Sequence, residues 1–163
     1  GISLARVVAK KLPKGYSEEI ADGTMYGEAL LAKSIIYAKL IQDILDAGIN
    51  LHYIANITGH GLRKIMRAKQ NFTYTLEKIF EPQDVFLFIQ KHANLSDYDM
   101  YQTYNMGQDY ALFLPEADIN KTQEVISKNG FESLDAGYVE EGKRQVIIQP
   151  KDIIFGGETL DLR

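Results

Sequence analysis

Apolar side chains recur along the chain with two periods, one typical of helices and the other typical of strands. Between residues 28 and 47 they repeat every four positions in two adjacent rows, and Gly48 follows as a left-handed helix stop. From residue 51 to residue 57, strongly apolar and mixed positions alternate with a period of two. The pattern predicts a helix over 28–47 and a strand over 51–57.

The same two periods divide the rest of the chain. Helices are expected over 3–12, 62–68, 82–93, 96–103 and between Pro115 and Gly130, and strands over 72–76, 109–114, 134–140 and 144–149. Ser96 with Asp99 forms a capping-box variant at one helix start. Residues 14–27 are typical of a surface loop, whereas 109–114 is apolar enough for a buried strand. The last two strands flank a Glu-Gly-Lys turn, which predicts a hairpin.

This mixture of elements predicts the α+β class, with a mixed β-sheet covered by helices on one face. No internal repeat and no low-complexity linker interrupts the chain. We therefore expect residues 1–163 to form a single domain.

Composition excludes several classes of protein. The chain has no cysteine, which excludes a disulfide scaffold, a thiolate zinc site and a cysteine nucleophile. The net charge of −4 argues against a nucleic-acid partner, and no apolar run approaches the roughly 20 residues that span a bilayer. The first 81 residues carry 11 basic and 8 acidic side chains, and the remainder carries 7 and 14. This asymmetry fits phosphate handling by one half or two solvated faces of different sign.

The clearest candidate for chemistry is the loop Thr58, Gly59, His60 and Gly61, between a predicted strand and a predicted helix. Backbone amides at such a turn can hold a phosphate, and glycines let the anion approach closely. Four cations follow within seven residues, beginning at Arg63. The alternative is a plain turn whose cations face water, since Gly-x-Gly matches neither the Walker loop nor the dinucleotide fingerprint.

Two further features are candidates for the same site. His60 is the histidine best placed to reach a ligand and exchange a proton, although an exposed side chain without a functional role fits the sequence equally. The spacing of the histidines does not suggest a metal site. Asn105 and Gly107, just before a predicted strand, form either a tight turn or a pocket edge.

These motifs resemble the C-terminal domain of the aminoimidazole ribonucleotide synthetase family, also called phosphoribosylformylglycinamidine cyclo-ligases. The run from Ile57 to Leu62 is similar to the family's Ile-Thr-Gly-Gly-Gly-Leu, and 100–107 is similar to its Met-Tyr-x-Thr-Phe-Asn-Met-Gly. Matches at 1–6, at Ile36-Tyr37 with Lys39 and at 136–139 extend the resemblance over nearly the whole chain.

The resemblance implies a cytoplasmic ligase of purine biosynthesis, in which an N-terminal ATP-binding domain precedes the α+β domain and builds a homodimer. ATP with Mg²⁺, bound mainly by that N-terminal domain, would activate the formyl oxygen of the substrate as a phosphate ester, after which a nitrogen closes the ring. We expect the N-terminal domain to be absent from residues 1–163, and this chain alone is not expected to turn over ATP. Its partners would be that domain and a small phosphorylated metabolite.

Carried onto this sequence, the family pattern places Thr58, Gly59, His60 and Gly61, with Arg63 in support, on an anion-facing loop, and Asn105 and Gly107 on the cleft wall. His60 stands where the family has a glycine and is the candidate catalytic residue. Residues 64–68 lack the family's Glu-Asn-x-Pro-Arg. Two alternatives stay open: a related ATP-dependent phosphotransfer enzyme with another substrate, and a stand-alone ligand-binding module without catalysis.

Overall fold

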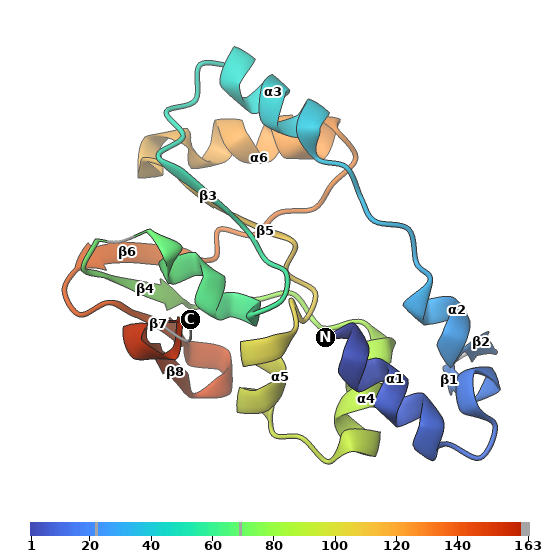
Figure 1. The fold of residues 1–163 in the computed structure, drawn as a ribbon. Coiled ribbons are helices and arrows are strands. Elements are labelled where there is room, and N and C mark those ends of the chain that lie inside the picture. Colours follow the sequence, from blue (N-terminus) through green and yellow to red (C-terminus); the bar gives the residue numbers. More distant parts are fainter. Residues whose placement is uncertain (22, 69, 161–163) are drawn as a thin grey trace.

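Eight strands form three separate sheets in the computed structural model, which describes residues 1–21, 23–68 and 70–160 (Figure 1). The largest is a mixed sheet in the order β6 (Gly137–Glu141), β4 (Phe72–Leu76), β7 (Gln145–Ile148) and β8 (Ile153–Gly156), with β4 and β7 parallel and the other pairs antiparallel. Two antiparallel ribbons pair β3 (Tyr53–Asn56) with β5 (Tyr110–Phe113) and β1 (Glu19–Ala21) with β2 (Thr24–Met25). The predicted α+β class and mixed sheet are confirmed.

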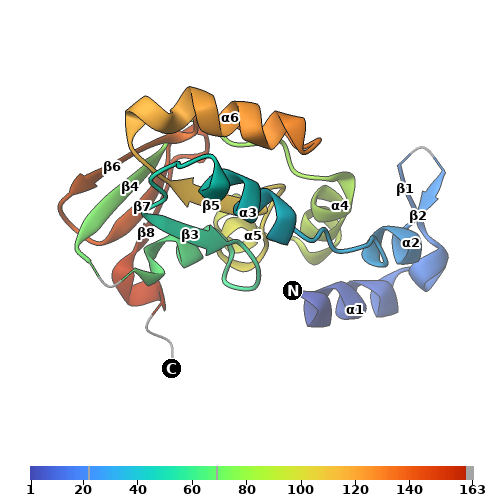
Figure 2. The ribbon, with the colours of Figure 1, turned by 90° about the horizontal axis from the view of Figure 1, so that it is seen from above.

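Most of the α-helices fall into two packed groups. The α-helices are α1 (Ile2–Lys11), α2 (Tyr26–Leu30), α3 (Ala38–Asp46), α4 (Asp84–Ala93), α5 (Asp97–Thr103) and α6 (Ile119–Lys128). Short 3₁₀ helices are η1 (Gly15–Ser17), η2 (Gly61–Arg67), η3 (Glu116–Asp118), η4 (Gln149–Lys151) and η5 (Gly157–Leu160). α3 and α6 lie side by side over the β3–β5 ribbon, whereas α1, α2 and α4 pack together beside β1 (Figure 2).

Two hydrophobic clusters hold these layers. The larger joins α1, α4, α5 and η2 to the mixed sheet and buries Tyr26, Tyr101 and Phe155 completely. The smaller lies between α3 and α6. β5 contributes to both clusters, since Phe113 packs on the larger cluster and Leu112 packs on the smaller one. Because successive strand residues point to opposite faces, the β3–β5 ribbon forms a layer between the two clusters.

The predicted helix over 28–47 is wrong as one continuous element, because residues 32–37 separate α2 from α3 without regular structure. Ile36, which begins one of the predicted apolar rows, is 83% exposed. The Tyr37 hydroxyl donates a hydrogen bond to the Asp109 carboxylate. This long-range contact and the packing of the Tyr37 ring outweigh the local helical period.

The predicted hairpin of the last two strands is also wrong, although both strands exist. β4 lies between β6 and β7, and the Thr73 hydroxyl of β4 donates to the Lys143 carbonyl in the connection (2.8 Å). A local turn signal cannot show that a distant strand will insert between its neighbours. β8, which no pattern predicted, pairs with β7 on the far side.

Two burial predictions need correction. The stretch 14–27 is only partly a surface loop, since it contains η1, β1 and β2 and begins α2 with the fully buried Tyr26. The strand predicted to be buried is β5, and all four of its residues are only half-buried. The capping box of Ser96 and Asp99 is confirmed at the start of α5.

Two buried tyrosines provide a matched test of the larger cluster. The Tyr26 hydroxyl donates to the Ala5 carbonyl (2.9 Å), whereas the Tyr101 hydroxyl has no hydrogen-bond partner within the described residues. We expect Tyr26→Phe to lower the free energy of unfolding at pH 7 by about 1 kcal/mol, and Tyr101→Phe to raise it by a similar amount. Urea unfolding would measure both, and equal losses would contradict the unpaired state of Tyr101.

The same two tyrosines predict how the stability of the fold changes at alkaline pH. Burial raises the pKa of both Tyr26 and Tyr101 to about 12. Because the folded state holds these protons more tightly than the unfolded state, their contribution is present below pH 10 and is lost as the pH rises from about 10 towards 12. Each Phe variant should therefore show a shallower loss of stability in this range than the unchanged protein.

Candidate functional site

The predicted anion loop lies at the carboxyl end of β3. Thr58, Gly59 and His60 are exposed, and a turn forms because the Gly61 amide donates to the Thr58 carbonyl (2.9 Å). His60 has φ of +85°, a left-handed conformation that costs an L-residue roughly 1–2 kcal/mol. Within the described residues, the amides of Gly59 and His60 donate to no backbone or side-chain acceptor. The loop therefore presents free donors to solvent.

Gly61 fixes the loop against the end of α5. It has φ of +55°, and a Cβ at this position would lie 1.9 Å from the Tyr101 carbonyl oxygen. This close approach needs glycine for both conformation and space. The contact brings the loop next to the 100–107 segment, about forty positions away in the sequence.

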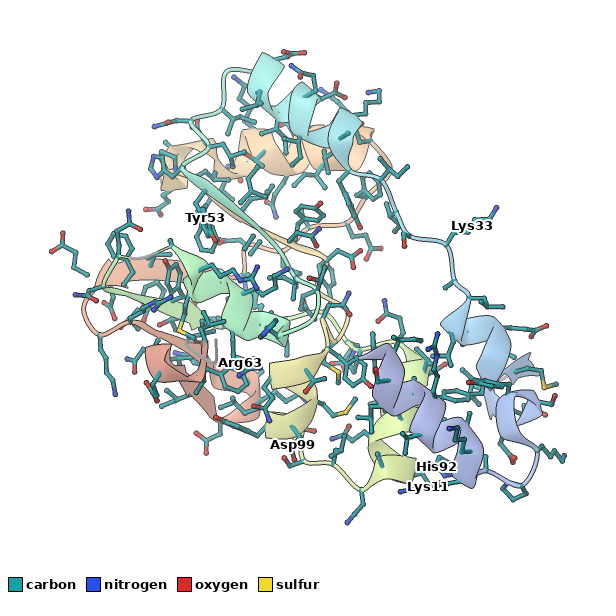
Figure 3. All side chains as sticks on the ribbon, in the orientation of Figure 1. Lys11, Lys33, Tyr53, Arg63, His92 and Asp99 are labelled. Atoms are coloured by element: carbon teal, nitrogen blue, oxygen red, sulfur yellow. The ribbon has the colours of Figure 1, made fainter. Side chains whose placement is uncertain are left out.

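Arg63 strengthens the same junction. Its guanidinium is buried and donates to the Gln102 carbonyl through Nη2 (2.8 Å) and to the Thr159 carbonyl through Nη1 (2.6 Å). Burial lowers the pKa of Arg63. Figure 3 shows Arg63 between η2 and the neighbouring α5. The described bonds of Arg63 thus hold the loop in place, and its support of an anion stays a prediction.

Lys64 supplies a cation at the loop. Its Nζ donates to the Thr58 hydroxyl, and the side chain is half-buried. Burial and the nearby Arg67 lower the pKa of Lys64. The sequence indicated a run of cations here, but its spacing did not show which member would fold back over the loop.

The second predicted segment forms a tight turn between α5 and β5. Met106 and Gly107 have φ of +50° and +89°, and a Cβ on Gly107 would lie 2.6 Å from the Glu81 carbonyl oxygen. The side-chain oxygen of Asn105 accepts from the Gly107 amide (3.4 Å), and its Nδ2 donates to Asp109 Oδ1 (3.0 Å). Asn105 therefore orders the turn from within.

Asp109 connects this turn to the loop. Its carbonyl accepts from the Ile57 amide (2.8 Å), and its carboxylate accepts from Asn105 and from the Tyr37 hydroxyl. Burial and the bond to Asp109 raise the pKa of Tyr37, whose ring packs on Tyr110 with centroids 4.7 Å apart. Neither Tyr37 nor Asp109 was a predicted site residue. The available signals were the Ile-Tyr match and the position of Asp109 two residues after the Asn-Met-Gly motif.

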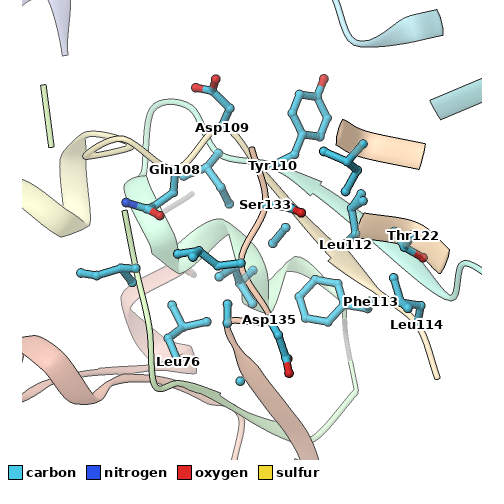
Figure 4. Close-up of a pocket in the computed structure, with 18 of the residues that line it drawn as sticks. Leu76, Gln108, Asp109, Tyr110, Leu112, Phe113, Leu114, Thr122, Ser133 and Asp135 are labelled. Carbon is cyan, nitrogen blue, oxygen red and sulfur yellow. The ribbon is translucent and has the colours of Figure 1, made fainter. Parts of the chain in front are cut away.

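A cavity of about 920 Å³ lies beside this network (Figure 4). Gly107 and Asp109 border it, whereas Thr58, Gly59 and His60 do not. Of the predicted site residues only Gly107 borders the cavity, whereas Thr58, Gly59 and His60 are exposed outside it and Gly61 and Arg63 are buried.

Two searches of the described residues gave negative findings. In 1–21, 23–68 and 70–160, no three His, Asp or Glu side chains are grouped closely enough to hold a metal ion. Over the same residues, no helix has the length and apolar character needed to cross a membrane.

Comparison with known proteins gives a consistent set of relatives. The phosphoribosylformylglycinamidine cyclo-ligase of Methanopyrus kandleri is 34% identical over 149 residues, which cover 90% of this chain and 42% of the relative. The enzyme of the same name from Methanocaldococcus jannaschii is 33% identical over 130 residues, covering 78% and 37% of the two chains. That of Rippkaea orientalis is 27% identical over 157 residues, covering 93% and 46%.

The chain belongs to the phosphoribosylformylglycinamidine cyclo-ligase family. The predicted resemblance is thereby confirmed. A comparison with models of protein families gives no match. The chain spans less than half the length of these cyclo-ligase relatives.

Substitution of two left-handed glycines tests the contact between the loop and α5. We expect Gly61→Ala to lower the free energy of unfolding by about 3 kcal/mol, because the methyl group adds a backbone clash to the conformational strain. Gly48, with φ of +71°, has no atom within 4 Å of a Cβ. Gly48→Ala should therefore cost only about 1 kcal/mol. Similar losses in urea unfolding would show that the close approach is absent.

A second comparison isolates the backbone strain at His60. His60→Gly and His60→Ala both remove the imidazole, but only alanine keeps the Cβ that disfavours φ of +85°. We expect the glycine variant to be more stable than the alanine variant by about 1 kcal/mol in thermal or urea unfolding. An alanine variant of equal stability would contradict the left-handed conformation.

Proposed function

We propose that this chain is the substrate-cleft part of a phosphoribosylformylglycinamidine cyclo-ligase or a close relative, and that its loop Thr58–Gly61 binds the phosphate of a small phosphorylated metabolite. The observation that carries this proposal is the convergence of two distant motifs. Gly61 abuts the end of α5, and the Ile57 amide donates to the Asp109 carbonyl, so the loop and the Asn105–Gly107 turn lie at the same end of the β3–β5 ribbon.

The donors of the loop suit an anionic group. The amides of Gly59 and His60 are free within the described residues, and the Lys64 ammonium lies on the Thr58 hydroxyl. A partly desolvated cation beside backbone N–H groups gives short, charge-assisted hydrogen bonds to phosphate. Arg63 acts as a positioning residue in this arrangement, since it fixes the start of η2 to the Gln102 carbonyl.

His60 is the proposed proton-exchanging residue of the loop. Its ring is exposed, and Nδ1 lies 2.9 Å from the Gly59 carbonyl oxygen. A histidine that uses one ring nitrogen in this way leaves Nε2 to face a ligand.

ATP and Mg²⁺ are proposed to bind mainly to the N-terminal domain of the cyclo-ligases, in a cytoplasmic homodimer. In the described part of this chain, no three His, Asp or Glu side chains are grouped as they would be around a metal ion. Phosphoryl transfer needs metal ions and fixed donors around the transferred group. We therefore propose that this chain alone does not turn over ATP and instead positions the substrate.

The second candidate is a phosphotransfer enzyme of the same fold with another substrate. It is favoured by Lys64, which stands where the cyclo-ligase pattern has a glutamate and contacts Thr58. Exchange of an acid for a cation reverses the charge presented to the ligand, and specificity depends on such differences. ADP release by the full-length protein, with formylglycinamidine ribonucleotide or without it, would separate the two enzymes. A stand-alone binding module would release none.

Ribose 5-phosphate binding tests the loop directly. We expect it to slow amide hydrogen exchange at residues 58–60, and Lys64→Met to weaken its affinity about tenfold through loss of one charge-assisted bond. Lys33→Met is the matched control, because Lys33 is exposed on the irregular 32–37 stretch (Figure 3). Unchanged exchange at 58–60, or equal weakening by both variants, would contradict the proposed phosphate site.

A further inference from the structure

The cavity of about 920 Å³ separates the β3–β5 ribbon from strands β4 and β6 of the mixed sheet. Its volume falls within the roughly 300–1,000 Å³ typical of small-molecule sites. Most of its wall is apolar and aromatic, with the Tyr53 ring tilted against Phe113 (centroids 5.5 Å apart) and Tyr74 set edge-on to the same ring (5.4 Å). Phe80 and Phe131 add further rings. Aromatic walls of this kind favour a flat, apolar ligand.

One wall of the cavity is an unpaired strand edge. Among the described residues β5 pairs only with β3, and all four residues of β5 border the cavity. The Ile57 amide donates to the Asp109 carbonyl, and the register then pairs Ala55 with Ala111 and Tyr53 with Phe113. In an antiparallel ladder the intervening residues turn their peptide groups to the other edge.

Leu112 is such an intervening residue. Within the described residues, no hydrogen bond outside the β3–β5 ladder involves its N–H or its carbonyl. An unpaired peptide group away from bulk water costs free energy, so a partner with both donor and acceptor character would stabilise it. The Leu112 edge therefore offers directional hydrogen bonds beside a mostly apolar and aromatic wall.

Charges lie at the margin of this space. Lys78, Glu132 and Asp135 border the cavity but are exposed, and the Asp109 carboxylate is already bonded to Asn105 and Tyr37. A charged ligand would lose its hydration without gaining an unengaged counter-charge inside. The wall therefore selects for a neutral molecule.

We propose that this cavity binds a small, uncharged, planar heteroaromatic molecule, with its ring against the Phe113 wall and its ring N–H or nitrogen bonded to the Leu112 peptide group. The site is separate from the proposed phosphate loop, since Thr58, Gly59 and His60 do not border the cavity. An experiment that excludes ligand binding at one of these sites therefore leaves the proposal for the other site unaffected.

Indole and the hydrocarbon indene make a matched pair of probes, because they share shape but only indole carries an N–H. We expect titration with indole, followed by amide NMR, to shift the resonances of 110–113 and 133–136. Loss of one hydrogen bond should make indene bind about tenfold more weakly. Equal affinity of the two probes, shifts scattered over the surface, or no shift at millimolar indole would overturn the proposal.

A filled cavity provides the second test. Ser133 lies at the wall in Figure 4 and has no hydrogen bond within the described residues, so Ser133→Phe adds a ring there without removing a bond. It should weaken indole binding about tenfold or more, while Ser3→Phe on the exposed side of α1 should leave it unchanged. Unchanged affinity in Ser133→Phe would overturn the site. Should that variant not fold, the indole and indene comparison on the unchanged chain decides alone.

Discussion

The position of Asp109 is the constraint on which the candidate site depends. A half-buried carboxylate must be hydrogen-bonded, and Asp109 takes its donors from Asn105 and Tyr37 while its carbonyl accepts from Ile57. These donors come from three separate segments. One residue thus fixes the entry to β5, the end of β3 and the start of α3 relative to one another.

Local sequence patterns predicted the elements whose stabilisation is local. α5 was found from its capping box, since Ser96 and Asp99 bond to each other within one turn. The left-handed turn before β5 and the loop after β3 were found from their glycines, because close backbone approach admits no side chain at Gly61 or Gly107. The family resemblance rested on these same runs, where backbone geometry restricts the choice of residue.

Features set by long-range contacts could not be predicted in this way. The interruption before α3 depends on Tyr37 reaching Asp109, and the insertion of β4 between β6 and β7 depends on strand order. The sequence left Arg63 open between support of an anion and a solvent-facing cation, and it did not show that the guanidinium would donate to the carbonyls of Gln102 and Thr159. Charge and hydrophobic periodicity indicate where cations and apolar side chains lie along an element. The partners of these side chains depend on the tertiary fold.

Because β5 contributes side chains to both clusters, the number of residues in this strand is constrained. Phe113 enters one cluster and Leu112 the other, and both residues pair with β3 in a fixed register. Deletion or insertion of a single residue in either strand would exchange the two sets of side chains. Length variation among homologues should therefore fall outside this ribbon, in connections that carry neither cluster.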